Sequence, residues 1–261
     1  MSRLLVPAKP SAEGILHDIT PQSAGWTYVG FATRKLAGAP VEIDTQEREL
    51  CLVVLSGRAR VSAAGFDSGE IGERADVFSG LPWSVYLPPR TRAKVEGEAE
   101  IALCTAPATG KLPARVIPPG AVETMTRGKG TNLRHVRNIL SETAQAESLL
   151  VVEVITPSGH WSSYPSHKHD QDNLPHESLL EETYYHRLNP PQGFAFQRVY
   201  TDDRSLDETM TVGDRDVVLV PRGYHPCAAA HGYELYYLNV MAGPKRIWRF
   251  HNDPAHEWLM A

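Results

Sequence analysis

The sequence predicts an all-β protein built from two tandem antiparallel β-barrels. With 20 Gly and 20 Pro among its 261 residues, the chain favours many short strands joined by tight turns. Its length suits either one large domain or two domains of about 120 residues. The order of elements also repeats, because Glu182 and Pro221 each lie 133 residues after Glu49 and Pro88, at matching places in their segments. A duplicated all-β unit explains this repeat most simply.

The first copy is expected to span residues 1–115 and to hold no metal. Its apolar run over 49–57 ends in Ser-Gly, and residues 58–61 then alternate polar and apolar, which is a hairpin pattern. No histidine occurs between His17 and His135, so this copy cannot build a three-histidine site. We interpret it as a scaffold, or as a dimerisation and lid domain.

The second copy is expected to span residues 116–261. The Pro- and Gly-rich stretch over 107–138 suits a linker with an edge strand around Val116. One helical turn is expected over 141–147. The apolar, β-branched run over 149–156 then indicates a buried strand of the second barrel.

Four residues of the second copy are candidate metal ligands. His167 and His169 lie two residues apart in an extended segment, and alternation along a strand sends such a pair to one face. The two imidazoles can converge on a divalent ion if further ligands come from neighbouring strands. Glu182, which opens an alternating run, and His225, which follows a Pro-x-Gly turn, are those candidates. Imidazole and carboxylate ligands admit Zn, Mn, Fe or Ni, so one divalent ion is expected and its identity is left open.

Composition and charge limit the classes of partner. The formal net charge is −5, from 26 Lys and Arg against 31 Asp and Glu, and no basic run is present to hold nucleic-acid phosphates. Residues 1–10 lack the apolar core of a signal peptide, and no stretch approaches the roughly 18 apolar residues that span a bilayer. We therefore expect a cytoplasmic protein with a small-molecule partner. Cys51, Cys104 and Cys227 are an odd, widely spaced set, expected as buried reduced thiols.

The candidate metal motifs resemble those of the cupin superfamily, whose fold is a small antiparallel barrel with a metal held by three His and one Glu. A narrower resemblance, to the 5-deoxy-glucuronate isomerase family of bacterial inositol catabolism, covers nearly the whole chain. It rests on the segments 159–170, 180–185, 199–203, 220–226 and 250–253. The Trp-Ser-Ser-Tyr-Pro run in the first of these is far more specific than the general cupin motif. The resemblance implies a bicupin, with its metal in the second barrel.

The spacing of the ligands departs from the general cupin pattern. Twelve residues separate His169 from Glu182, where the usual motif has three or four. A loop over 172–176 must therefore be extruded before the strand resumes. This spacing leaves Glu181 as a rival ligand, and Glu182 is preferred because it lies where Glu49 lies in the first copy.

The resemblance also implies a reaction, the aldose–ketose isomerisation of 5-deoxy-D-glucuronate to 5-dehydro-2-deoxy-D-gluconate. A proton leaves C2 and one is delivered to C1 through an enediolate, whose charge a divalent ion would stabilise as a Lewis acid. A proton carrier must line the cavity. By strand parity Tyr184 and His186 should face inward with Glu182, while Lys168 should point away from the histidines beside it. Asp207 and Glu208 lie just before the segment over 210–213, and one of these carboxylates, with Glu208 preferred, could also face the site.

A sugar-acid substrate also requires a cation for its carboxylate. A planar guanidinium suits bidentate binding of a carboxylate. Arg198, in the strand expected over 194–201, is preferred to Arg222. The aromatic tail over 247–259 is expected to pack across the barrel mouth or against a second subunit of a homo-oligomer.

Two other functions remain open on the sequence alone. One is an iron-dependent cupin dioxygenase, because the same ligand set binds Fe(II) and leaves positions for O₂. The other is a non-enzymatic sugar-acid-binding cupin, although the chain has no appended DNA-binding helices and no basic face. An isomerase would equilibrate an aldose acid with its ketose without consuming oxygen, which separates it from both.

Overall fold

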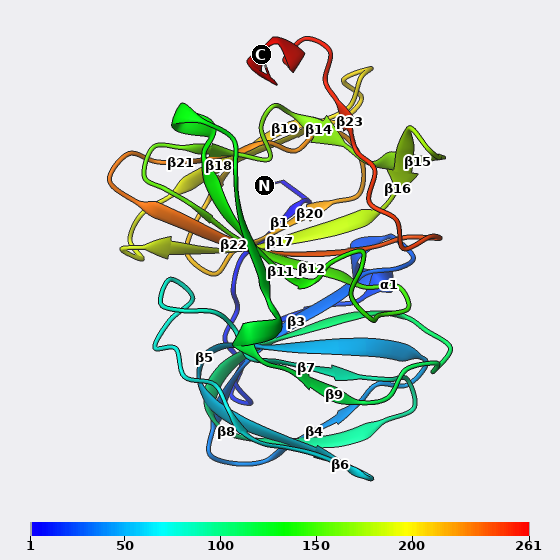
Figure 1. Ribbon diagram of the computed structural model, residues 1–261. Helices are drawn as coiled ribbons and strands as arrows, with labels where there is room; N and C mark the ends of the chain where they lie inside the picture. Colours follow the sequence, from blue (N-terminus) through cyan, green and yellow to red (C-terminus); the bar gives the residue numbers. More distant parts are fainter. Residues whose placement is uncertain (1, 261) are drawn as a thin grey trace. The chain divides into compact units, whose positions relative to one another are not determined.

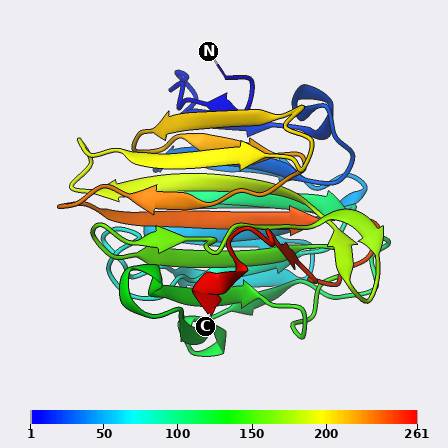
Figure 2. The ribbon, with the colours of Figure 1, turned by 90° about the horizontal axis from the view of Figure 1, so that it is seen from above.

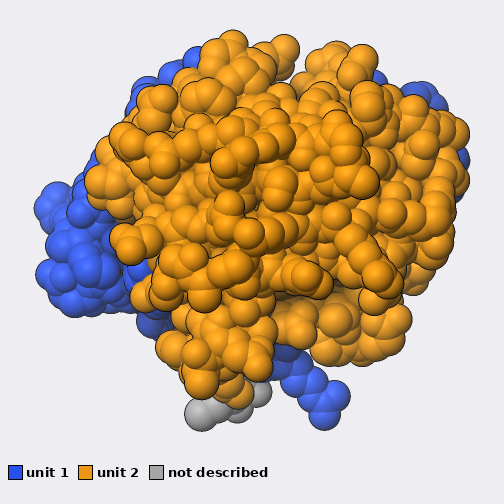
Figure 3. Space-filling model, turned by 90° about the horizontal axis from the view of Figure 1, so that it is seen from below, with its two compact units in different colours: residues 1–7, 124–137, 152–261 blue, residues 8–123, 138–151 orange. Residues whose placement is uncertain are grey.

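The computed structural model describes residues 2–260, which form antiparallel strands with only short helical turns (Figure 1). The predicted all-β class is confirmed. The chain divides into two compact units, coloured in Figure 3. Unit 1 comprises the residues up to Pro7, Thr124–Arg137 and the residues from Val152 onward, and unit 2 comprises Ala8–Glu123 and Asn138–Val151.

These units have different limits from the two domains proposed from the sequence, 1–115 and 116–261. The division falls inside β11 (Arg134–Leu140) and β12 (Leu150–Thr156), so the chain passes between the units more than once. The first strand, β1 (Leu5–Val6), pairs with a strand more than 200 residues later in the chain, at Val217 and Val218. Contacts group the residues differently because a sheet collects strands by pairing and not by their order in the chain.

Unit 2 contains an antiparallel sheet in the order β2-β3-β8-β5-β7-β9, in which β4 also pairs with β8 and β6 with β5. Its elements are β2 (Ile15–Ile19), α1 (Pro21–Ala24), β3 (Gly30–Ala37), β4 (Val41–Asp44), β5 (Arg48–Ala63), β6 (Phe66–Ile71), β7 (Ser84–Leu87), β8 (Arg92–Pro107), β9 (Arg115–Ile117) and η1 (Pro119–Ala121). Leu50, Leu52 and Val54 of β5 belong to its buried hydrophobic core. The edge strand expected around Val116 is confirmed as β9, the last strand of the sheet.

The hairpin expected at residues 56–57 does not form, because β5 continues through this point in a ladder with β8. The register of the ladder shifts between Val54 and Ser56, as in a β-bulge. Gly57 has a φ of +80°, and a Cβ there would collide with the carbonyl oxygen of Glu98. The Ser-Gly pair therefore marks a bulge inside a long strand and not its end.

The helical turn expected over 141–147 does not form either. Ser141 Oγ bonds Thr143 Oγ1 at 3.0 Å, and the segment consists of turns and bends. The backbone N–H groups of residues 147–149 instead donate to the buried carboxylate of Glu49, at 2.8, 2.6 and 2.6 Å. An anionic acceptor satisfies these donors better than a single isolated helical turn could.

Unit 1 contains a seven-stranded sheet in the order β1-β20-β17-β22-β12-β11-β10, a four-stranded sheet β13-β21-β18-β19, and the pairs β14-β23 and β15-β16. Its remaining elements are β10 (Glu123–Arg127), η2 (Gly130–Asn132), β13 (Trp161–Ser162), β14 (His167–Lys168), β15 (Asp170–Asn173), β16 (Glu177–Leu179), β17 (Glu181–Asn189), β18 (Ala195–Tyr200), β19 (Asp207–Val212), β20 (Val217–Val220), β21 (Cys227–Ala229), β22 (Glu234–Ala242), β23 (His251–Asn252) and η3 (Glu257–Met260). The buried strand expected over 149–156 is confirmed as β12. The red C-terminal segment with η3 lies at the end of unit 1 that holds β14, at the top of Figure 1 and nearest the viewer in Figure 2.

Two other expectations concern the cysteines and membrane-spanning segments. Cys51, Cys104 and Cys227 are buried free thiols, as expected. None of the helices among residues 2–260 combines the length and the apolar character that a membrane-spanning helix requires.

The two units repeat the same strand pairing with a difference of one residue. Glu182 on β17 pairs with Val220 on β20, whereas Leu50 on β5 pairs with Leu87 on β7. Val220 follows Leu87 by 133 residues, but Glu182 follows Leu50 by 132. Leu50, and not Glu49, therefore occupies the place of Glu182, and the argument that preferred Glu182 because it repeats Glu49 is wrong.

Candidate metal centre

Four side chains converge in unit 1. Ligand atoms of His167, His169 and His225 lie within 4.8 Å of one another. Glu182 Oε2 lies 3.2 Å from Nε2 of both His169 and His225. Donor atoms about 2.1 Å from a shared ion and at right angles to each other would be about 3 Å apart, close to these spacings. The structure thus brings together the four residues that the sequence suggested as ligands.

Local backbone geometry directs these side chains to one point. His167 ends up beside His169 because β14 is extended there, with their ring centroids 6.2 Å apart. His225 follows a turn in which Gly223 has a φ of +90°, and a Cβ at Gly223 would collide with the carbonyl oxygen of Tyr200. The glycine therefore permits the close approach of two backbones that turns His225 inward.

The hydrogen bonds of the rings leave electron pairs facing the centre of the cluster. Nδ1 of His169 lies 3.0 Å from the Leu180 carbonyl oxygen, and Nδ1 of His225 lies 2.8 Å from that of Gly223. Because a carbonyl only accepts, each Nδ1 must carry the proton, and Nε2 of the neutral ring then presents a lone pair. Nε2 of His225 has no hydrogen-bond partner among the described residues. Nε2 of both His169 and His225 therefore faces the same carboxylate oxygen of Glu182, an arrangement that a cation would stabilise.

Electrostatics keep two of the histidines neutral. Burial lowers the pKa of His225 to about 4. Burial, followed by the charges of His225 and His169, holds the pKa of His167 well below its usual range. Burial also disfavours protonated His169, but its hydrogen bond to Glu182 and the charge of that carboxylate outweigh burial and raise its pKa. At neutral pH, His167 and His225 are therefore available as neutral donors to a metal.

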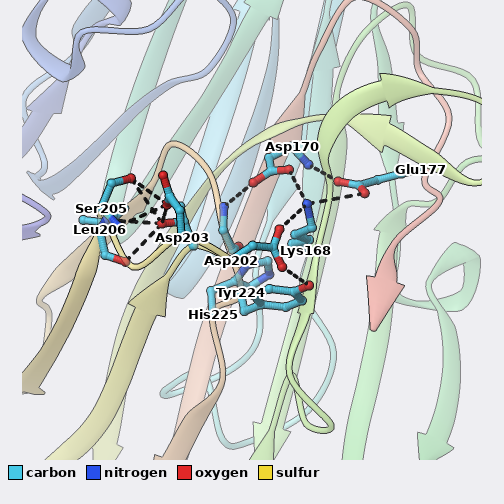
Figure 4. A network of polar contacts seen from close by, with 11 residues as sticks. Lys168, Asp170, Glu177, Asp202, Asp203, Ser205, Leu206, Tyr224 and His225 are labelled. Carbon is cyan, nitrogen blue, oxygen red and sulfur yellow. Dashed lines mark hydrogen bonds and ion pairs between the residues drawn. The ribbon is translucent and has the colours of Figure 1, made fainter. Parts of the chain in front are cut away.

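Lys168 points away from the histidines, as strand alternation predicts, and its ammonium lies among carboxylates (Figure 4). Nζ is 3.1 Å from both Asp170 and Asp202 and 3.8 Å from Glu177. Burial disfavours the charged amine, but hydrogen bonds and charges of these carboxylates outweigh it and raise the pKa of Lys168. Asp170 also accepts the Gly223 N–H at 2.8 Å. The network therefore ties the strand of the first two histidines to the turn that holds the third.

A cavity of about 470 Å³ adjoins this cluster, within the size range of small-molecule sites. His167 and Glu182 line it together with Tyr184. Trp248 and Phe250, from the C-terminal tail, form part of its apolar wall. The tail therefore packs over the mouth of the barrel in unit 1, which is one of the two arrangements expected from the sequence.

The two proton-carrier candidates on β17 have different surroundings. Tyr184 lines the cavity and bonds Ser163 Oγ through its hydroxyl at 2.8 Å. Burial raises the pKa of Tyr184 well above its usual range, so the phenol stays protonated. His186 stacks on the Tyr184 ring with centroids 5.9 Å apart, but it lies deeper and is fully buried. Its Nε2 bonds Gln197 Oε1 at 2.8 Å, and it does not line the cavity.

The structure does not bring the other three predicted residues to the cavity. Arg198 forms a two-bond ion pair with Asp207, at 2.7 Å for each bond. It alternates on β18 with buried neighbours and therefore faces outward. Glu208 is partly exposed on β19, and Arg222 reaches Ser205 Oγ at 3.4 Å. None of these side chains belongs to the cavity wall.

Two arginines that the sequence did not suggest do line the cavity. Arg127 ends β10 and Arg134 begins β11. Both fall in the stretch over 107–138, which was interpreted as a linker. The residues of β11 do not alternate clearly between apolar and polar, so no period-2 signal in the sequence indicated a strand that starts at Arg134.

Comparison with known proteins identifies relatives along the whole chain. A family model described as the KduI/IolB family matches residues 4–259. A protein of Geobacillus kaustophilus named 5-deoxy-glucuronate isomerase is 57% identical over 265 residues, covering 100% of this chain and 96% of its own length.

Solved structures also resemble this chain. An IolB-like protein from Salmonella typhimurium superposes with a TM-score of 0.96 at 52% identity, over 99% of each chain. The oxalate decarboxylase of Lactobacillus farciminis superposes with a TM-score of 0.67 at 13% identity, covering 97% of this chain and 89% of its own. At that identity the second likeness concerns the fold alone, and it confirms the predicted bicupin architecture.

Proposed function

This chain belongs to the KduI/IolB family, and from that premise we propose that it converts 5-deoxy-D-glucuronate into its ketose isomer in inositol catabolism with the aid of one divalent metal ion. It is an isomerase, as its relatives are named. The observation that most supports a metal is the convergence of three imidazoles and one carboxylate on the wall of a cavity.

His167, His169, Glu182 and His225 would hold the ion. Three nitrogens and one oxygen suit Zn, Mn, Fe or Ni, and they leave positions free for a substrate. Such an ion, when bound, supplies Lewis-acid stabilisation of the negative charge that develops on the two oxygens of an enediolate.

The protein's own side chains orient the substrate and control protons. Tyr184 holds a proton at Oη, since its pKa is raised, and Ser163 Oγ at 2.8 Å offers a route for exchange. The hydroxyl can therefore donate to a substrate oxygen during isomerisation. Trp248 and Phe250 limit the access of water, which protects an enediolate from unwanted protonation. Lys168 is not among the residues that line the cavity, and we assign it a positioning role.

Three hypotheses followed from the sequence, and the relatives favour one. The proteins at 49–57% identity bear the name 5-deoxy-glucuronate isomerase. No feature of the described site favours the dioxygenase or the non-enzymatic binding protein over the isomerase. A cytoplasmic location and a homo-oligomer stay proposals from the sequence.

The decisive experiment combines metal analysis with an isomerisation assay. Purified protein, His167→Ala, Glu182→Ala and the control His176→Ala are analysed for bound metal and assayed for aldose-to-ketose conversion and for oxygen uptake. We expect the first two variants to lose metal and activity together. His176 lies exposed in the turn between β15 and β16, so the control should resemble the unmodified protein.

Three results would contradict parts of the proposal. Full activity of protein stripped of metal would exclude the metal-dependent route. Loss of activity in Glu182→Ala with its metal fully retained would mean that this carboxylate is not a ligand. Oxygen consumption during turnover would favour the dioxygenase instead.

A further inference from the structure

The cavity wall of unit 1 is unusually basic for a site that contains only one carboxylate. Arg127, Lys129 and Arg134 line it, whereas Glu182 is its only acidic residue among those described. Adjacent strands bring the two guanidinium groups to the same end of the sheet, because β10 and β11 are neighbours and are joined by the short segment over 128–133.

Neither guanidinium forms an ion pair within the described chain. Arg134 Nη1 donates to the carbonyl oxygens of Asn132 and Tyr164, at 3.1 and 3.3 Å. Arg127 donates to Met125 Sδ at 3.3 Å and lies over the Trp248 ring, 5.8 Å from its centroid. These contacts leave several N–H donors of each arginine for a ligand.

Two other arginines of unit 1, by contrast, are paired with carboxylates. Arg187 contacts Asp214 at 2.8 Å, and Arg198 contacts Asp207 at 2.7 Å. No carboxylate among residues 2–260 pairs with either of these two half-buried guanidinium groups, and burial and the nearby charge of Arg134 both lower the pKa of Arg127. An anion between them would relieve this repulsion.

We propose that Arg127 and Arg134 bind the carboxylate of the substrate and so make the enzyme selective for a sugar acid over a neutral sugar. This inference rests on the proposed isomerase function and assigns the carboxylate to residues other than Arg198 and Arg222. Planar guanidinium groups bind carboxylates through two parallel bonds, which also fixes the orientation of the sugar chain. The reacting end, C1 and C2, is then left to the histidine cluster.

Steady-state kinetics of Arg127→Gln and Arg134→Gln test this assignment, with Arg198→Gln and Arg222→Gln as controls from outside the cavity. A contact made equally in ground and transition states raises KM and leaves kcat unchanged when it is removed. A charge-assisted hydrogen bond contributes about 1.5–3 kcal/mol, so KM for 5-deoxy-D-glucuronate should rise about 10- to 100-fold in each cavity variant. The controls should keep the KM of the unmodified enzyme.

A neutral analogue and metal analysis separate carboxylate binding from a general loss of structure. 5-Deoxy-D-glucose, with CH₂OH in place of the carboxylate, should inhibit the unmodified enzyme and both cavity variants equally. Metal content should also stay constant, because a residue needed only for the carboxylate leaves the histidine cluster intact.

Contrary results have distinct meanings. An unchanged KM in both cavity variants, a lower kcat at constant KM, or loss of metal would overturn the assignment while the isomerase function stands. If the unmodified, metal-loaded enzyme does not isomerise 5-deoxy-D-glucuronate at all, the proposed function fails, and this inference fails with it.

Discussion

Replacing Lys168 with methionine tests whether the buried ionic network positions the metal ligands. The substitution keeps the unbranched apolar stem of the side chain and removes the ammonium that lies between Asp170, Asp202 and Glu177. Asp170 and Glu177 would then be left nearly buried without a cation, and an amide hydrogen bond from Gly223 would remain as one of the few contacts of Asp170.

The expected magnitude follows from the exposure of each partner. The side chains of Lys168, Asp170 and Glu177 are 5%, 12% and 7% exposed, whereas that of Asp202 is 65% exposed and can return to water. Removing one member of a buried ion pair costs 3–5 kcal/mol, so with one solvated partner we expect a loss of about 3 kcal/mol in the free energy of unfolding. Changes in the residues that support metal ligands lower metal affinity about 10- to 100-fold.

Urea unfolding of metal-free protein measures the stability, and a titration with Mn or Zn measures the affinity. Lys245→Met is the matched control, because its ion pair with Asp172, at 2.9 Å, is 52% and 41% exposed. Such a surface pair contributes about 0–1 kcal/mol. If Lys168→Met has the same stability and metal affinity as Lys245→Met, the network does not position the ligands and the reasoning is refuted.

Three further predictions concern Glu49, Glu147 and Tyr184. Glu49→Gln places an NH₂ donor against the N–H and O–H donors that now contact the carboxylate. Urea unfolding should therefore show a loss of about 2–4 kcal/mol in the free energy of unfolding. A change near zero would contradict this. Partial burial disfavours ionised Glu147, but hydrogen bonds from Thr109 and the backbone outweigh it and lower its pKa from 4.5 to about 2. The contribution of Glu147 to stability is therefore present above pH 4.5 and is lost as the pH falls toward 2. Glu147→Gln should make the free energy of unfolding less dependent on pH between these values. An unaltered pH dependence would contradict this role of Glu147. Tyr184→Phe should keep its metal and lower kcat about 100-fold, whereas an unchanged kcat would remove Tyr184 from the proton route.

The sequence predicted the metal cluster because its ligands obey local rules. His167 and His169 share a face by strand alternation, and the turn before His225 requires a glycine. Glu182 was preferred to Glu181 because its position was matched to that of Glu49 in the first copy. The strand register contradicts that comparison. A one-residue difference in register reverses the face of every side chain, and sequence offsets between repeats do not reveal it.

The residues proposed to bind the substrate carboxylate could not be predicted from such local rules. Arg127 and Arg134 lie in strands at the far edge of the sheet from β20, in a stretch whose Pro and Gly content resembles a linker. Their place on the cavity wall depends on which strands become neighbours, which is a property of the whole fold. Arg198 was preferred because it lies in a strand, but parity on β18 turns it toward Asp207 and away from the cavity.

Contacts distant in sequence explain why the hairpin at 56–57 and the helical turn over 141–147 were wrongly predicted. Gly57 allows a bulge that continues β5, so a turn signal occurs inside a strand. The segment over 141–147 contains residues that suit a helix start, yet Glu49 offers its backbone a stronger acceptor from elsewhere in unit 2. Both outcomes arise from partners distant in sequence, which local propensities do not include.

The long insertion between His169 and Glu182 and the lysine at position 168 depend on each other. Asp170 opens β15 and Glu177 opens β16, so the inserted hairpin supplies two of the three anions that accompany the ammonium. Without this hairpin, as in cupins with the short spacing, Glu177 would be absent and a buried lysine at position 168 would lose one of its three carboxylate neighbours. The two features should therefore have been inherited together, and family members that have lost the hairpin are expected to have an uncharged residue in place of Lys168.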